Sequence, residues 1–159
     1  MNIDEKKTLL QEQIAKSLLI LDEIKVFYSH LKNQQLPEIG NTQISATLFS
    51  EVFVSFYTCC ETVFVRISKF FENNIDKEHW HRDILDRMTL EIHGIRPRVI
   101  SDETKLILDE ILRFRHFKRY YFEFKYDWTR IEYLDKQFVK GFDNVKNDLS
   151  LFSERIKNI

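Results

Sequence analysis

The chain has 159 residues, of which 43% are hydrophobic and 31% charged, and its formal net charge at pH 7 is −1. This length and composition suit one soluble domain with a single core, spanning residues 1–159, and the balanced charge excludes a generally basic surface. Any contact with nucleic acid must therefore come from a local patch. With only three glycines and two prolines, the chain has few turn residues, which favours an all-α fold over a β-rich one.

The N-terminal sequence MNIDEKK lacks the apolar segment of a signal peptide, and no uncharged run approaches the roughly 18 residues that a membrane span needs. Cys59 and Cys60 are adjacent within an apolar run, which is typical neither of a disulfide framework nor of a CxxC metal site. His79 and His81 stand two apart at a helix start, away from that run. We therefore expect a cytoplasmic protein with buried thiols, no membrane association and no metal.

The first two predicted elements are long helices. Apolar residues recur every three or four positions from Asp4 to about Asn33, which predicts an amphipathic helix, and the proline, glycine and asparagines of NQQLPEIGN predict a turn after it. The stretch LFSEVFVSFYTCCETVFVRI is rich in β-branched and aromatic residues, but it lies in a run of roughly 30 residues without a turn signal, too long for a strand. We expect a helix from about Thr42 to Asn73, apolar all round and central in a bundle.

Three further helices are predicted in the second half of the chain. HRDILDRMTLEI predicts a short third helix, which the glycine and proline of HGIRPRVIS end. Ser101 is a suitable N-cap for a fourth helix, which we expect to run to about Phe124. Asp127 is predicted to cap a fifth helix, whose apolar stripe extends to Ile156. The expected fold is an antiparallel bundle of about five helices.

The end of the fourth predicted helix is basic and aromatic. RFRHFKRYYFEF, residues 113–124, combines arginines, a lysine, one histidine and six aromatic residues. Arg115 and Arg119 follow Leu108 and Leu112 at helical spacing, and Phe122 comes next, so the arginines are expected to extend an apolar stripe. Guanidinium groups in such a stripe must be paired, or must line a groove or a subunit interface, because an unpaired buried charge is expensive.

Two interpretations of this basic segment are open. Arginine forks suit phosphate oxygens, aromatic rings stack on unpaired bases, and imidazole transfers protons near neutral pH, so an RNA-directed site is chemically reasonable. Alternatively the segment is structural, with Arg115 and Arg119 paired to acidic residues and the two tyrosines packed as ordinary core residues. The acidic candidates for that pairing are Glu51, Glu61 and Asp109.

Four segments together resemble the HepT-like branch of the HEPN superfamily. They are FYTCCETVFVRI at 56–67, WHRDILDRM at 80–88, IRPRVIS at 95–101 and LDEILRFRHFKRYY at 108–121. Agreement in both order and spacing is more specific than any one motif. The resemblance also makes Trp80 and His81 a structural corner that holds the third helix.

The resemblance implies an all-helical fold, a symmetric homodimer and, for many members, a ribonuclease toxin paired with a minimal nucleotidyltransferase (MNT) antitoxin. It implies cleavage without a metal or cofactor, in a cleft that two subunits share. There an arginine holds the scissile phosphate of the RNA, and a histidine assists proton transfer to or from the ribose 2′-hydroxyl. In related systems the antitoxin can transfer AMP to a motif tyrosine.

This chain departs from the family pattern in two places. Arg115 aligns with the family's arginine and His116 with the polar residue after it, but Tyr120 stands where the histidine belongs and Phe122 replaces the tyrosine. The expected catalytic residues are therefore Arg115, His116 as substitute acid or base, and Arg119. The expected RNA-binding side chains are Arg113, Lys118, Tyr120 and Tyr121, and the expected AMP acceptor is Tyr120 or Tyr121.

Two alternatives to a ribonuclease remain. Because the motif histidine is missing, the chain is alternatively a degenerate HEPN domain that binds RNA or protein without cleaving RNA. A further alternative is an unrelated helical-bundle interaction protein.

Overall fold

The computed structural model describes residues 1–72, 80–120 and 124–159, with the backbone alone at 80–82 and 120. Its elements in chain order are α1 (Ile3–His30), a π-helical turn η1 (Leu31–Gln35), α2 (Leu36–Ile39), α3 (Gln43–Glu72), α4 (Trp80–Thr89), α5 (Asp102–Tyr120) and α6 (Trp128–Ile156). The described residues contain no strand beyond one isolated bridge, between Ile92 and Arg96. The all-α prediction is confirmed.

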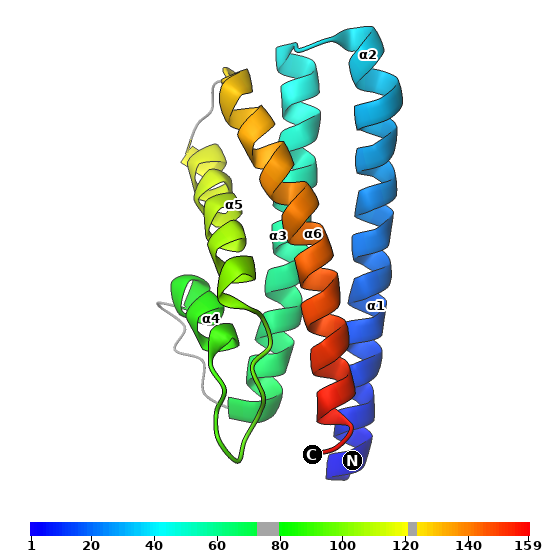
Figure 1. Ribbon diagram of the computed structural model, residues 1–159, viewed down its shortest axis with the longest axis vertical. Helices are drawn as coiled ribbons and strands as arrows, with labels where there is room; N and C mark the ends of the chain where they lie inside the picture. Colours follow the sequence, from blue (N-terminus) through cyan, green and yellow to red (C-terminus); the bar gives the residue numbers. More distant parts are fainter. Residues whose placement is uncertain (73–79, 121–123) are drawn as a thin grey trace.

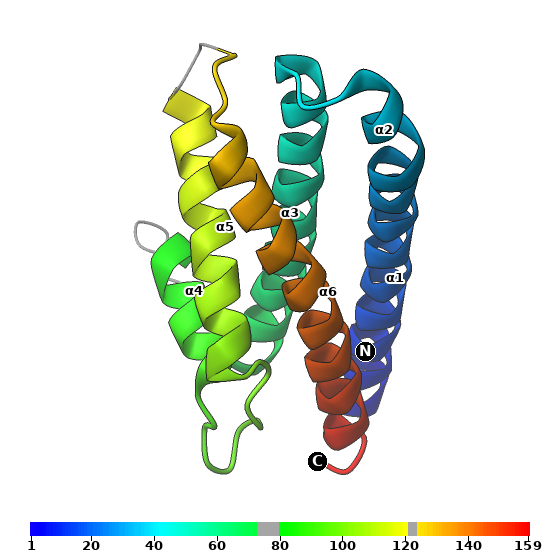
Figure 2. The same ribbon diagram turned by 45° about the horizontal axis from the view of Figure 1, so that its top comes forward.

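The four longer helices form an antiparallel bundle in which α3 is central (Figure 1). α3 contacts α1, α4, α5 and α6, whereas α1 and α5 lie on opposite sides of the bundle. Figure 2 shows α4 beside the first half of α5, with the last turns of α5 extending past it. The C-terminal end of α5 therefore lies near the start of α3, at the end of the bundle away from both chain termini.

Aromatic side chains from α3 and α6 fill the centre of the bundle. Phe53 and Phe56 are fully buried, and the Phe56 ring meets that of Phe138 edge to face with 5.2 Å between centroids. By length and composition alone α3 could cross a membrane, but 56% of its most apolar window is buried inside the bundle. Packing in the core accounts for a helix that is apolar on nearly every side, as the sequence indicated.

A buried carboxylate joins α1 to α6. Asp135 accepts hydrogen bonds from the Tyr28 hydroxyl and the Lys32 ammonium, each at 2.5 Å. Burial and the neighbouring Asp135 raise the pKa of the Tyr28 hydroxyl, so it remains a proton donor to the carboxylate. These contacts fix the rotation of α1 about its axis and so decide which of its residues face outward.

The chain turns within NQQLPEIGN, as predicted, but the helix that precedes the turn continues past the expected end near Asn33 to Ile39. Residues 31–39 continue as helix, and the chain turns only at Gly40, whose φ of 73° lies in the left-handed region that glycine tolerates. Pro37 lies in the first turn of α2, directly after the π-helical turn η1, and has no N–H to continue the hydrogen-bond ladder of the preceding turn. The wider π-helical turn before it is closed by the Leu36 N–H, which donates to the Leu31 carbonyl.

The predicted caps of the last two helices are present. Ser101 Oγ accepts the Thr104 N–H at 3.1 Å, and the Asp127 carboxylate accepts the Thr129 N–H at 3.0 Å. The predicted end of the fourth helix near Phe124 is wrong, because residues 124–127 are not helical. The side chain of Gln43 bonds to both backbone groups of Tyr126, and this holds the segment against the start of α3.

A buried arginine fixes the connection between α4 and α5. The Arg96 guanidinium donates two hydrogen bonds to Glu72 at 2.7 and 2.9 Å, and two more to the carbonyls of Arg87 and Leu90. Arg87 also donates to Glu72, at 3.1 Å. The IRPRVIS segment therefore serves the fold, because it ties this connection to the end of α3.

Gly141 of α6 packs against Ile107 of α5, and we predict that Gly141→Ala destabilises the protein. A Cβ there would lie 2.6 Å from Cγ2 of the buried Ile107. Overpacking costs about 1–3 kcal/mol, which exceeds the roughly 1 kcal/mol that alanine gains over glycine in a helix. Urea unfolding should show a lower midpoint, while Asn147→Ala, at an exposed position of α6, should change the free energy of unfolding by less than about 0.5 kcal/mol. An unchanged midpoint for Gly141→Ala would contradict this packing.

Candidate functional site

The last two turns of α5 carry cations on both its exposed and its buried sides. Ile107, Leu108, Ile111 and Phe114 are buried and attach the helix to the bundle. Arg113, His116 and Arg119 are exposed, and their spacing of three residues makes them neighbours along one ridge of the helix. We call these three residues the α5 ridge.

Arg115 lies on the buried side of the same turns. Its guanidinium donates to both carboxylate oxygens of Glu61, at 3.2 and 2.9 Å, and to Thr58 Oγ1 at 3.3 Å. Arg115 and Glu61 are only 8% and 6% exposed. This two-point, charge-assisted pair joins α5 to α3, as the structural interpretation of the basic segment expected.

Tyr57 completes this buried cluster. The Arg115 guanidinium lies over its ring, 4.6 Å from the centroid, and Tyr57 is one helical turn from Glu61 on α3. The Tyr57 hydroxyl is buried without a hydrogen-bond partner among the described residues, and burial, together with the charge of Glu61, raises its pKa. In the cluster of Tyr57, Glu61 and Arg115, side chains of α3 and α5 that are more than 50 residues apart in the sequence are in contact.

The geometry separates the two residues expected to cleave RNA. Arg115 is buried against α3, whereas His116, the next residue, is exposed about 100° further round the helix. A single subunit therefore does not present both side chains to one phosphate. The guanidinium of Arg115 is also neutralised by Glu61, so its charge does not face solvent.

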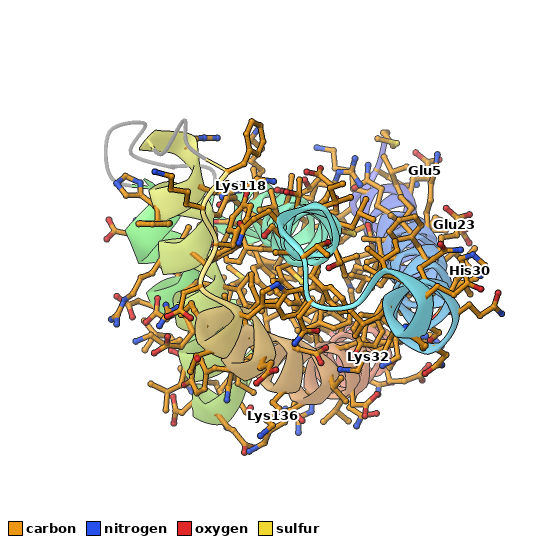
Figure 3. The ribbon with its side chains drawn as sticks, turned by 90° about the horizontal axis from the view of Figure 1, so that it is seen from above. Glu5, Glu23, His30, Lys32, Lys118 and Lys136 are labelled. Atoms are coloured by element: carbon orange, nitrogen blue, oxygen red, sulfur yellow. The ribbon has the colours of Figure 1, made fainter. Side chains whose placement is uncertain are left out.

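The remaining described cations of the segment differ in their surroundings. Lys118 pairs with Glu51 at 3.0 Å, and Figure 3 shows Lys118 near the start of α3. Within the part of the chain that the structure describes, Arg113 and Arg119 have no ion pair. The expectation that Arg119 extends the buried stripe is wrong, because its side chain is exposed in the last turn of α5.

Several expected residues lie outside the described part of the chain. They are Tyr121, Phe122 and His79, together with the side chains of Trp80, His81 and Tyr120. The RNA-binding and AMP-acceptor roles of the two tyrosines, and the corner formed by Trp80 and His81, therefore stay predictions.

The cysteines have the buried surroundings that the sequence indicated. Cys60 is fully buried and Cys59 half-buried, with the Cys59 thiol 3.7 Å from the Ser17 carbonyl oxygen. Burial raises the pKa of Cys59 to about 11 and that of Cys60 well above its usual value. Both thiols remain protonated at neutral pH and are poor nucleophiles.

Comparison with models of protein families finds a match over residues 48–156, to a family described as HepT-like protein. The matched region begins within α3 and includes the Tyr57, Glu61 and Arg115 cluster, the Arg96 connection and the α5 ridge. Comparisons with curated proteins and with solved structures find no match.

We predict that removing one member of the buried ion pair destabilises the fold more than removing both. Arg115→Ala leaves the Glu61 carboxylate buried without its cation, which costs about 3–5 kcal/mol of unfolding free energy. The double variant Glu61→Leu/Arg115→Leu should lose less, because no uncompensated charge remains. Chemical denaturation of both, with Arg113→Ala as the exposed control, checks this. Equal stability of Arg115→Ala and Arg113→Ala would refute a structural role for the pair.

Proposed function

The chain belongs to the HepT-like protein family, and on that basis we propose that it is the toxin-side component of a toxin–antitoxin module that acts on RNA. The observation that carries the proposal is the α5 ridge, which exposes Arg113, His116 and Arg119 within the matched region. The expected partners are RNA, a second copy of the chain and an MNT-type nucleotidyltransferase antitoxin, all in the cytoplasm.

The α5 ridge suits a single RNA strand. Arg113 and Arg119 lie about 9 Å apart along the helix axis, so their guanidinium groups can bind different phosphates. Phe117, 47% exposed, lies one turn from Arg113 on the same helix. With a net charge of −1 for the whole chain, this local group of cations is what directs a polyanion to α5.

Cleavage by this chain requires a homodimer. Because Arg115 and His116 point to different sides of α5, one subunit would supply the phosphate-binding arginine and the other the histidine that moves protons at the ribose 2′-hydroxyl. Arg115 would have to exchange the Glu61 carboxylate for the RNA phosphate, or use the N–H groups that Glu61 and Thr58 leave available. Arg119, one turn from Arg115, would bind the same phosphate. Tyr120 or Tyr121 would accept AMP from the antitoxin.

A second candidate function is RNA binding without cleavage. Two observations favour it: the Arg115 guanidinium is held by both oxygens of Glu61, and Tyr120 stands at the position of the family's catalytic histidine. In this case the ion pair is purely structural, and the exposed ridge alone contacts RNA.

We predict that the α5 ridge carries RNA affinity. Arg113→Ala and Arg119→Ala should each weaken binding of a single-stranded RNA and lower the slope of log affinity against log salt concentration by about 0.7, one phosphate contact each. Fluorescence anisotropy titrations at several salt concentrations measure both quantities. Lys136→Ala, at an exposed position of α6, removes the same charge and should leave the slope unchanged. Equal slopes for all three variants would exclude α5 as the interface.

Cleavage is predicted to be independent of metal and dependent on His116. Wild-type protein in excess chelator should cut unstructured RNA, and His116→Ala should slow cutting about 10²–10⁴-fold, the usual contribution of a general acid or base. If the wild-type protein binds RNA but leaves it uncut, the second candidate function is correct. If His116→Ala cuts at the wild-type rate, the histidine has no catalytic role.

A further inference from the structure

The buried hydroxyl of Tyr57 is a polar group that the proposed function leaves unused. Tyr57 is 0% exposed, and its hydroxyl has no hydrogen-bond partner among the described residues. Buried hydroxyls are nearly always bonded, because an unpaired one loses its hydrogen bonds to water without replacing them. A phenylalanine would fill the same space without that cost. The packing of α3 therefore does not account for a tyrosine at this position.

Tyr57 lies against both members of the buried ion pair. The Arg115 guanidinium lies over its ring, 4.6 Å from the centroid. Glu61 follows four residues later on α3, and helical side chains lean toward the N-terminus of their helix, so Glu61 is directed back toward Tyr57. Burial and, after it, the charge of Glu61 raise the pKa of the Tyr57 hydroxyl. The hydroxyl therefore stays protonated and is able to donate a hydrogen bond.

The Arg115 guanidinium comes close to the surface beside Thr58. Its Nη1 donates to Thr58 Oγ1 at 3.3 Å, which is long for a hydrogen bond of this kind. Thr58 is exposed, whereas Arg115 itself is only 8% exposed. Thr58 therefore marks the side from which a phosphate group can reach the guanidinium.

Glu61 is the obstacle to binding a phosphate at this position. If Arg115 turns to a phosphate, the Glu61 carboxylate, only 6% exposed, loses the hydrogen bonds from Nη1 and Nη2 of the arginine. A buried carboxylate without its cation is expensive unless another donor replaces the arginine. The Tyr57 hydroxyl is buried, protonated and unpaired one helical turn away, so it can supply the replacement.

We propose that Tyr57 is a positioning residue whose hydroxyl donates to Glu61 when Arg115 leaves that carboxylate for an RNA phosphate beside Thr58. In the closed state, which the structure shows, Glu61 holds Arg115. In the open state Tyr57 holds Glu61, and the guanidinium is available to an anion that shifts the population toward this state. The assignment of the anion to RNA rests on the proposed function, whereas the exchange between Arg115 and Tyr57 is measurable without RNA.

Labelling with the arginine reagent phenylglyoxal tests the exchange in the absence of RNA. The reagent needs a free guanidinium, so the rate at which Arg115 is labelled, followed by mass spectrometry, reports the population of the open state. Tyr57→Phe should slow this labelling about tenfold or more, the factor that corresponds to one hydrogen bond to a charged group. Labelling of the exposed Arg113 in the same sample should not change. Equal labelling of Arg115 in the wild type and in Tyr57→Phe overturns the proposal.

Two comparisons separate this role from packing. Tyr57→Phe removes an unpaired hydroxyl, so the midpoint of urea unfolding should stay equal or rise. Tyr28→Phe, the matched control, removes a buried hydroxyl that donates to Asp135, so it should lower the midpoint and leave the labelling of Arg115 unchanged. In Glu61→Gln the buried acceptor carries no charge, so adding Tyr57→Phe should change the labelling of Arg115 by less than about twofold. An undiminished effect of Tyr57→Phe in that background overturns a role through Glu61.

A short unstructured RNA then tests the identity of the anion. The RNA should slow the labelling of Arg115 in the wild type, and Tyr57→Phe should lose RNA affinity because less of the protein is in the open state. If the RNA binds but leaves the labelling of Arg115 unchanged, the guanidinium does not receive a phosphate and that part of the proposal is overturned. If the RNA does not bind the wild type at all, the proposed function fails, while the labelling without RNA still decides the exchange.

Discussion

The ion pair between Arg115 and Glu61 is the interaction on which the orientation of α5, and with it the exposed α5 ridge, depends. A charged pair with exposed fractions of 8% and 6% must be well bonded, and here the guanidinium meets both carboxylate oxygens while lying over the Tyr57 ring. Because the pair fixes the rotation of α5 against α3, it also fixes which neighbours of Arg115 face solvent. The exposure of Arg113, His116 and Arg119 follows from that rotation.

The two halves of α5 therefore differ in their surroundings. The first half of the helix is covered by α4 and α6, whereas the last two turns extend past α4 and carry the exposed cations. The same division explains why Arg115 and Arg119, one turn apart, have different surroundings. One is neutralised inside the bundle, and the other keeps its charge at the surface, where a polyanion can reach it. On the far side of the molecule, the buried Asp135 contacts orient α1 in a comparable way.

Much of the fold could be predicted from the sequence, because the apolar periodicity and the caps at Ser101 and Asp127 are local signals. The continuation of the first helix from Asn33 to Ile39 could not, since it runs through a π-helical turn for which the sequence has no local signal. For the site, the sequence alone left Glu51, Glu61 and Asp109 as possible partners of Arg115. The packing of α5 on α3 shows that the partner is Glu61 and that the pair is buried.

The central claim is that RNA meets this protein along the exposed side of α5. Ultraviolet cross-linking of the wild-type protein to a short unstructured RNA, followed by mass spectrometry of the linked peptides, tests it directly. We expect linked residues to concentrate in the peptides that cover residues 113–119. Cross-links that concentrate on α1 or α6 instead, or an RNA that leaves α5 unlinked, would contradict it.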